Sequence, residues 1–184
     1  MATSEPLEVL LVTNRWATEN LIAACLALTP EQFHQEFLLG PGSLHHALTH
    51  ILESMQYWAD MLAGREPQFE EDPGQPHPPM VGSFGIVYTE SGSESRTPQQ
   101  LLDLLNRIAD DLEASARRRP IDESVTWKAS IEKRFAFPRG GVLTHVATHG
   151  MHHRAQCLNM LRQLGVDPLP ASSVHDWMMT VDRP

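Results

Sequence analysis

Histidines are concentrated in two segments of this chain. Of its 184 residues ten are histidine, and seven of the ten lie within residues 45–50 and 145–153. Neutral imidazole nitrogens are common ligands of divalent transition metals. In an α-helix, side chains four residues apart project from the same face, so two imidazoles at that spacing can bind one ion. The spacing occurs in the pairs His46/His50, His145/His149 and His149/His153.

The apolar pattern around the histidines separates inward from outward candidates. If residues 142–164 form a helix, its apolar stripe centres near Val146 when successive residues are placed about 100° apart. His149 and His153 then point toward the core, whereas His145 and His152 lie at the border with solvent. We therefore expect His149 and His153 to be the ligands from this segment.

The segment 43–64 offers a third ligand. His50 lies at the flank of its apolar stripe, whereas His46 shares the polar side with Glu53. The predicted metal site consists of His50, His149 and His153. Three protein ligands leave at least one coordination position open, as in catalytic zinc sites. Side chains that could orient these ligands are Tyr57, His46 and Glu53.

Other interpretations of these residues are open. Each histidine can be a core residue that forms hydrogen bonds without a metal. A carboxylate-bridged di-iron site needs a Glu-x-x-His motif on two helices, but the only such motif runs from Glu31 to His34. Cys157, one turn after His153, could be an extra ligand. We interpret it, like Cys25, as a small buried apolar residue.

Four segments with helical periodicity would have to position the histidines. Apolar residues recur every three or four positions in 6–28, 43–64, 97–119 and 142–164. Ser43 and Thr97 can cap two of these helices, and Thr29-Pro30 can begin a short helical turn. Gly64 and Gly165 can close two of them in the left-handed conformation. The sequence predicts an all-α protein, a four-helix bundle formed by residues 1–184 as a single domain.

Two connections differ in character from the helices. Residues 65–96 are rich in proline, glycine and serine, which predicts a long crossover between the second and third helices with a short extended piece at 86–88. Residues 125–127 and 135–137 predict a small hairpin before the fourth helix. The third helix ends in Arg117, Arg118 and Arg119. We interpret these arginines as stabilising the negative end of the helix dipole, with an anion site as the alternative.

The amino-acid composition argues against several classes of binding partner. With 14 Lys and Arg against 23 Asp and Glu, the formal charge of −9 argues against binding nucleic acid or an anionic membrane. Two cysteines far apart in the sequence make no disulfide framework, which favours the cytoplasm. The first residues lack the basic and apolar pattern of a secretory signal, and no apolar run is long enough to span a membrane.

The histidine segments resemble the motifs of a known family. Residues 145–156, HVATHGMHHRAQ, are similar to the His-x-x-His-His-Arg-Gly-Gln signature of the DinB superfamily, bacterial four-helix bundles often called damage-inducible proteins. Residues 42–51 resemble its second-helix motif, and residues 14–20 resemble its first helix. One departure is Ala155, where the family usually has glycine; it should leave the metal ligands intact but can change how closely a neighbouring helix approaches.

The resemblance implies a function and partners. In this superfamily a divalent metal, commonly nickel or zinc, is held by one histidine of the second helix and two of the fourth, which correspond here to His50, His149 and His153. Relatives include thiol-dependent S-transferases and isomerases, so the resemblance implies a metal-dependent enzyme with a small-molecule substrate and a low-molecular-weight thiol as cofactor. It also implies a homodimer. The alternatives are a metal-dependent hydrolase and a metal-binding stress-response protein without catalysis.

Overall fold

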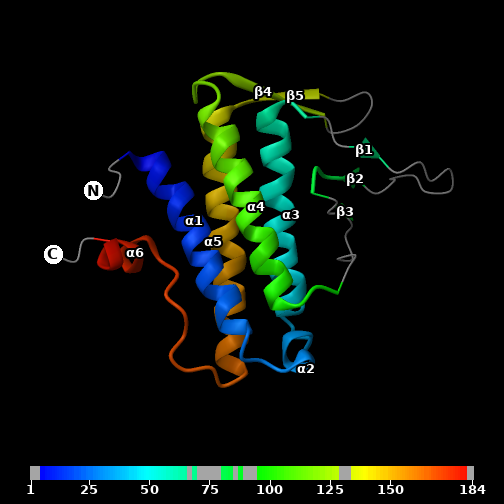
Figure 1. The fold of residues 1–184 in the computed structure, drawn as a ribbon, viewed down its shortest axis with the longest axis vertical. Helices are drawn as coiled ribbons and strands as arrows, with labels where there is room; N and C mark the ends of the chain where they lie inside the picture. The colour runs from blue at the N-terminus through cyan, green and yellow to red at the C-terminus, as the bar shows by residue number, and fades with distance from the viewer. Residues whose placement is uncertain are drawn as a thin grey trace.

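The predicted all-α bundle is confirmed by a computed structural model, which describes residues 5–65, 68–69, 80–84, 87–88, 95–128 and 134–181. Four long helices form the bundle, with the short helices α2 and α6 outside it (Figure 1). The helices are α1 (Pro6–Cys25), α2 (Pro30–Phe33), α3 (Leu44–Ala63), α4 (Pro98–Arg117), α5 (Arg139–Gln163) and α6 (Val174–Val181).

The direction of the helices explains the long crossover. Helices α1 and α3 each pack against both α4 and α5. Figure 1 shows α3 and α4 running in one direction and α1 and α5 in the other. Because α3 and α4 are parallel, the chain must return along the whole bundle between them, which a short turn cannot do. Much of the predicted crossover 65–96 lies outside the described residues.

Side-chain caps fix several helix ends as predicted. The Ser43 hydroxyl accepts a hydrogen bond from the amide of His46, and Thr29 and Thr97 each form a complete capping box. Gly64 (φ 74°) and Gly165 (φ 81°) adopt the left-handed conformation that ends α3 and follows α5. The sequence therefore determines these boundaries through local hydrogen bonds.

Two boundaries were predicted wrongly. Helix α1 ends at Cys25, not Leu28, because the amides of Leu26 and Leu28 bond only three residues back. Helix α5 begins at Arg139, not Val142. The amide of Arg139 donates to the carbonyl of Glu123 at 2.9 Å, and the next amide donates to an adjacent loop carbonyl at 2.8 Å. Tertiary contacts thus supply hydrogen-bond acceptors for the first amides of α5. The two glycines after Arg139 hid this start of the helix in the sequence.

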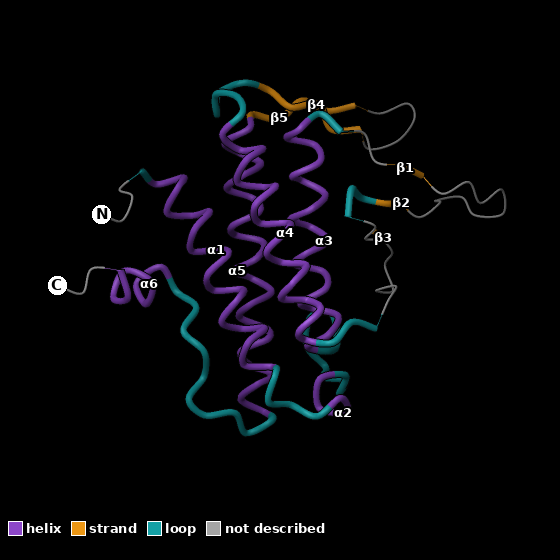
Figure 2. The backbone as a smooth tube through the Cα atoms, in the orientation of Figure 1, coloured by secondary structure: helices purple, strands orange, loops and turns teal. Residues whose placement is uncertain are grey.

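Strands lie outside the helical bundle (Figure 2). The predicted hairpin is confirmed as β4 (Ser124–Lys128) paired antiparallel with β5 (Arg134–Pro138). The crossover contributes β1 (Gln68–Phe69), β2 (Met80–Val81) and β3 (Val87–Tyr88) in an antiparallel sheet of order β1-β2-β3. Of these, β3 falls within the predicted extended piece, whose first residue Ile86 lies outside the described residues. Strands β1 and β2 were not predicted.

The core fills the space between the four long helices. All four long helices contribute large, fully buried side chains, and α2 adds Phe33. Those of α5 are Leu143, Met160 and Leu161. No helix in the described ranges is long and apolar enough to cross a lipid bilayer. Helix α6, which was not predicted, packs against α1.

Candidate metal centre

Three histidines from two helices converge at one point between α3 and α5. The Nε2 atom of His149 lies 3.2 Å from Nε2 of His50 and 3.2 Å from Nε2 of His153. One nitrogen from each of the three rings lies within 4.8 Å of the others. Among the described residues, this is the only group of three or more His, Cys, Asp or Glu side chains close enough to share a metal ion. These are the three residues that the sequence predicted.

Burial keeps the three imidazoles neutral. All three are half-buried, and loss of solvent is the largest cause that lowers the pKa of each ring. The pKa of His149, which has the other rings around it, falls to about 4, with His153 as the next cause. A neutral imidazole has one nitrogen with a free lone pair, which is the form that binds metals. The site therefore offers lone pairs at neutral pH.

A hydrogen bond fixes which nitrogen of His153 faces the cluster. Nδ1 of His153 lies 2.8 Å from Oε1 of Gln156. An amide oxygen only accepts, so Nδ1 carries the proton and Nε2 presents its lone pair to His149. Gly40 supports this arrangement: a Cβ added there would lie 2.3 Å from the same Gln156 oxygen. Sequence reasoning missed both residues, although Gln156 lies one helical turn after a predicted ligand.

A buried arginine anchors the side of α5 that faces α1. Arg154 is 5% exposed and donates from Nη1 to Oδ1 of Asn14 at 2.6 Å and to Oγ1 of Thr18 at 3.1 Å, both on α1. Gly150 leaves room for this contact, since a Cβ there would lie 2.5 Å from the Asn14 oxygen. Residues 150 and 154 each follow a candidate ligand. Anchoring them on α1 turns His149 and His153 toward α3.

The other clustered histidines stay outside the three-histidine group. His145 and His152 are exposed, as predicted, and their rings contact His149 and His153 respectively. His46 lies 4.0 Å from a carboxylate oxygen of Glu36. His45 is buried, and its Nε2 accepts a hydrogen bond from the Arg96 amide at 3.2 Å. His45 is therefore a hydrogen-bonded core histidine.

The remaining predicted neighbours do not join the group. Cys157 and Cys25 are fully buried free thiols, and burial raises both pKa values, that of Cys25 to about 12. They behave as small apolar residues. Glu53 lies one turn after His50, and its buried Oε1 has no hydrogen-bond partner among the described residues. The Tyr57 ring packs edge-on against Trp58.

Comparison with known proteins identifies the family. The sequence profile described as "DinB family" matches residues 1–182. The chain belongs to the DinB family. A curated relative, Protein DinB of Bacillus subtilis (strain 168), is 22% identical over an alignment of 166 residues, and the match covers 85% of this chain and 85% of the relative. This DinB-family assignment agrees with the resemblance of the histidine segments. Two other residues of the DinB-like motif, Arg154 and Gln156, lie where they support the ligands.

Glu53 generates a prediction about stability. Burial raises its pKa from 4.5 to about 7, although the nearby Arg96 charge opposes this. The folded protein thus binds this proton more tightly than the unfolded chain, so Glu53 lowers the free energy of unfolding as pH rises from about 4.5 to about 7. Glu53→Gln should remove that loss and stabilise the metal-free protein by roughly 3 kcal/mol above neutral pH.

Urea unfolding across this pH range, with EDTA present, measures the difference. The gain of Glu53→Gln should shrink as the pH falls below 7. Glu19→Gln changes the same charge at an exposed position of α1 and should leave the pH dependence as it is. If the stability of the Glu53→Gln protein depends on pH as that of the unmodified protein does, the raised pKa of Glu53 is contradicted.

Proposed function

We propose that this DinB-family protein binds one divalent transition metal ion, nickel or zinc, through His50, His149 and His153, and uses it to transfer a low-molecular-weight thiol to an electrophilic small molecule. The observation that carries the proposal is the convergence of three neutral imidazole nitrogens within 4.8 Å. A cation bound between them would accept a lone pair from each of the three rings at once.

The donor set fits such an ion. Zinc–nitrogen bonds of about 2.0–2.1 Å in tetrahedral geometry separate two ligand nitrogens by about 3.4 Å. The two nitrogen–nitrogen distances here are 3.2 Å each. A site of three imidazoles suits zinc, nickel, copper and iron chemically, and the resemblance to DinB proteins favours the first two.

The roles that a bound ion and the surrounding side chains would have in this site support an enzyme. A bound ion would lower the pKa of a thiol or water at its open position, so that either could lose its proton near neutral pH. The chain's own residues hold the site ready: burial keeps the imidazoles unprotonated, and Gln156 holds the His153 ring in one orientation. Metal-dependent hydrolysis would use the same site with water in place of the thiol.

An apolar pocket beside the histidines supports a small-molecule substrate. A cavity of about 450 Å³ is lined by Trp58, Phe137, Pro138, Gly141, Val142 and His145. The His145 ring contacts both Trp58 and His149, so the pocket adjoins the candidate centre. A pocket of this size and character is typical of small-molecule sites. It favours an enzyme over a metal-binding stress protein without catalysis.

Metal content tests the first half of the proposal. Protein purified without a histidine tag should contain about one equivalent of nickel or zinc per chain, or should take it up when the ion is added. His149→Ala removes the central ligand and should abolish stoichiometric binding. The matched control is His175→Ala, which removes an exposed imidazole on α6 and should retain the ion. Elemental analysis measures the metal content. If the native protein contains no metal as purified and takes up none when nickel or zinc is added, every metal-dependent function is ruled out.

Gln156 provides a finer test of how the ligands are held. Gln156→Ala removes the partner of Nδ1 of His153, and loss of such outer contacts weakens metal affinity by about 10–100-fold. Gln163→Ala is the control, because Gln163 is an exposed glutamine on α5 that bonds only to Asn159 within its own helix. Competition titration with a chelator measures both affinities. Equal affinities for the two variants would contradict an orienting role for Gln156.

Thiol transfer tests the enzymatic half. The metal-loaded protein should conjugate a model electrophile to bacillithiol, mycothiol or glutathione faster than buffer. The rate should disappear in His149→Ala and persist in His175→Ala. No rate with any of the three thiols, from protein that does bind the metal, would leave the metal site standing and contradict the transferase.

A further inference from the structure

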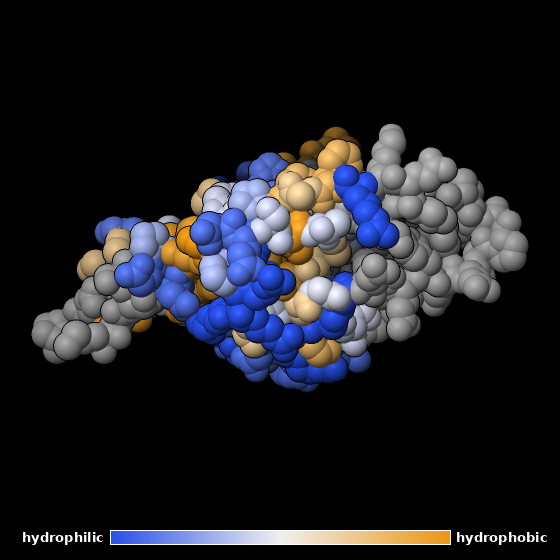
Figure 3. Space-filling view, turned by 90° about the horizontal axis from the view of Figure 1, so that it is seen from above, coloured by the Kyte–Doolittle hydropathy of each residue, from blue (hydrophilic) through white to orange (hydrophobic). Residues whose placement is uncertain are grey.

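A second cavity, rich in arginine, lies at the end of the bundle that carries the β4–β5 hairpin. Its volume is about 360 Å³, and it lies among the ends of α3 and α4, strands β4 and β5, and the first residue of α5. Figure 3 looks down on this end of the molecule. Arg139 lies ten residues before His149 on α5, which corresponds to about 15 Å along the helix. The cavity is therefore separate from the candidate metal centre.

The walls of this cavity carry unusual positive charge for an acidic protein. The chain has only 14 Lys and Arg and a formal charge of −9. Among the described residues, five arginines and no acidic side chain line the cavity. They are Arg65, Arg118, Arg119, Arg134 and Arg139.

Carboxylates outside the cavity neutralise two of the five arginines. Arg65 is paired with Asp60 and Asp111, and Arg119 with Glu123. The side chains of Arg118 and Arg134 form no ion pair or hydrogen bond with any described residue. The positive charge of the cavity is thus only partly balanced by the protein itself.

Arg139 places in the buried wall a charge that the protein compensates only in part. It is 2% exposed, and it donates from Nη1 to the Leu62 carbonyl at 2.9 Å and from Nη2 to the Ser115 carbonyl at 2.6 Å. Its buried Nε has no hydrogen-bond partner in the described part of the chain. Loss of solvent is the largest cause that lowers the pKa of Arg139, and the Arg119 charge lowers it further, while the Glu123 carboxylate opposes both in part. A buried cation of this kind costs free energy unless an anion lies close to it.

Helix capping accounts for part of this cluster only. Arg139 bonds to carbonyls near the ends of α3 and α4, where a cation stabilises the helix dipole. The same effect explains a cation at Arg118, the residue that follows α4. It does not explain Arg134, which lies on β5. Nor does it explain why all five line one cavity.

We propose that this cavity binds a small anion that carries phosphate or carboxylate groups. Arginine suits such ligands because its planar guanidinium donates two parallel hydrogen bonds to a pair of oxygens. A cavity of about 360 Å³ has room for a small organic molecule rather than a single ion. The proposal does not depend on the metal or on the transferase activity.

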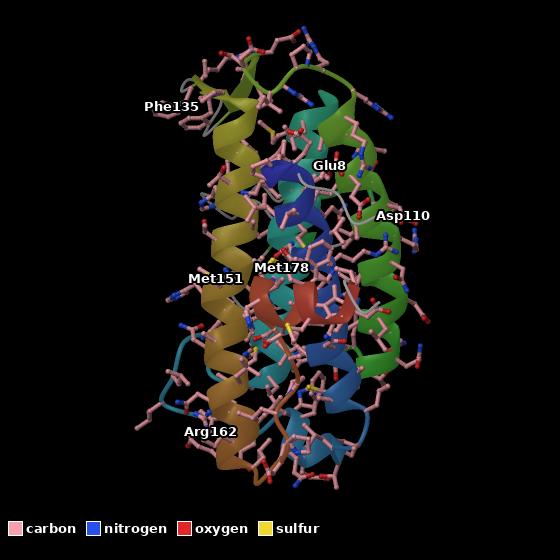
Figure 4. The ribbon with its side chains drawn as sticks, turned by 90° about the vertical axis from the view of Figure 1, so that its left-hand side faces the viewer. Glu8, Asp110, Phe135, Met151, Arg162 and Met178 are labelled. Atoms are coloured by element: carbon pink, nitrogen blue, oxygen red, sulfur yellow. The ribbon has the colours of Figure 1, made fainter. Side chains whose placement is uncertain are left out.

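Isothermal titration calorimetry with phosphate, pyrophosphate and citrate tests the proposal. At least one of the three should bind at a single saturable site, and Arg118→Gln and Arg134→Gln should each weaken it by about tenfold, because each removes a charged hydrogen bond. The matched control is Arg162→Gln. Arg162 is also an exposed arginine at the end of a long helix, but Figure 4 shows it at the opposite end of the molecule from Phe135 of the hairpin.

Comparing the affinities of the three anions distinguishes a phosphate site from a carboxylate site. Repeating the titrations on a variant without the central metal ligand tests whether the anions bind to a metal ion instead. Tighter binding of pyrophosphate than citrate assigns phosphate groups, and the reverse assigns carboxylates. Because these anions also bind metals, the titrations are repeated on His149→Ala, where the affinity should be unchanged. The proposal is overturned if none of the anions binds, if Arg118→Gln and Arg134→Gln bind as the unmodified protein does, if Arg162→Gln weakens binding equally, or if binding is lost in His149→Ala.

Discussion

The rotation of α5 about its own axis is the constraint on which the candidate centre depends. Arg154 fixes that rotation, because its guanidinium is buried against Asn14 and Thr18 of α1 and would be left without a partner in any other orientation. Gly150 lets the two helices approach closely enough for the contact. Since each of these residues directly follows a candidate ligand, the contact with α1 turns both ligands toward α3. A polar contact inside the bundle thus determines where the imidazoles meet.

Two different kinds of buried polar side chain lie at different heights along the bundle. Near the middle of α5, burial keeps imidazoles neutral and their lone pairs available, with Gln156 holding one ring in place. At the hairpin end, burial instead leaves the Arg139 charge partly unsatisfied. The apolar pocket around Trp58 and Phe137 lies beside the first of these regions. The same helix therefore lines two chemically different regions, one with neutral imidazoles and one with arginine side chains.

Much of this arrangement was predictable because it depends on local spacing. The four-residue interval between His149 and His153 requires only a helix, and the stripe around Val146 indicates which side of it is buried. Caps such as Ser43 and Thr97 depend on hydrogen bonds within a few residues. The start of α5 was missed because distant carbonyls satisfy its first amides. The strands β1 and β2 are only two residues each, too short to produce a periodic pattern.

The sequence alone determined the helices, the inward histidines and the family, because helical periodicity and motif spacing are properties of neighbouring residues. The tertiary structure alone decided that Arg154 contacts Asn14 of α1, that Gly40 packs against Gln156, and that arginines from four separate segments of the chain line one cavity. These contacts join residues far apart in the chain. They depend on how the helices are rotated and packed, and no local pattern carries that information.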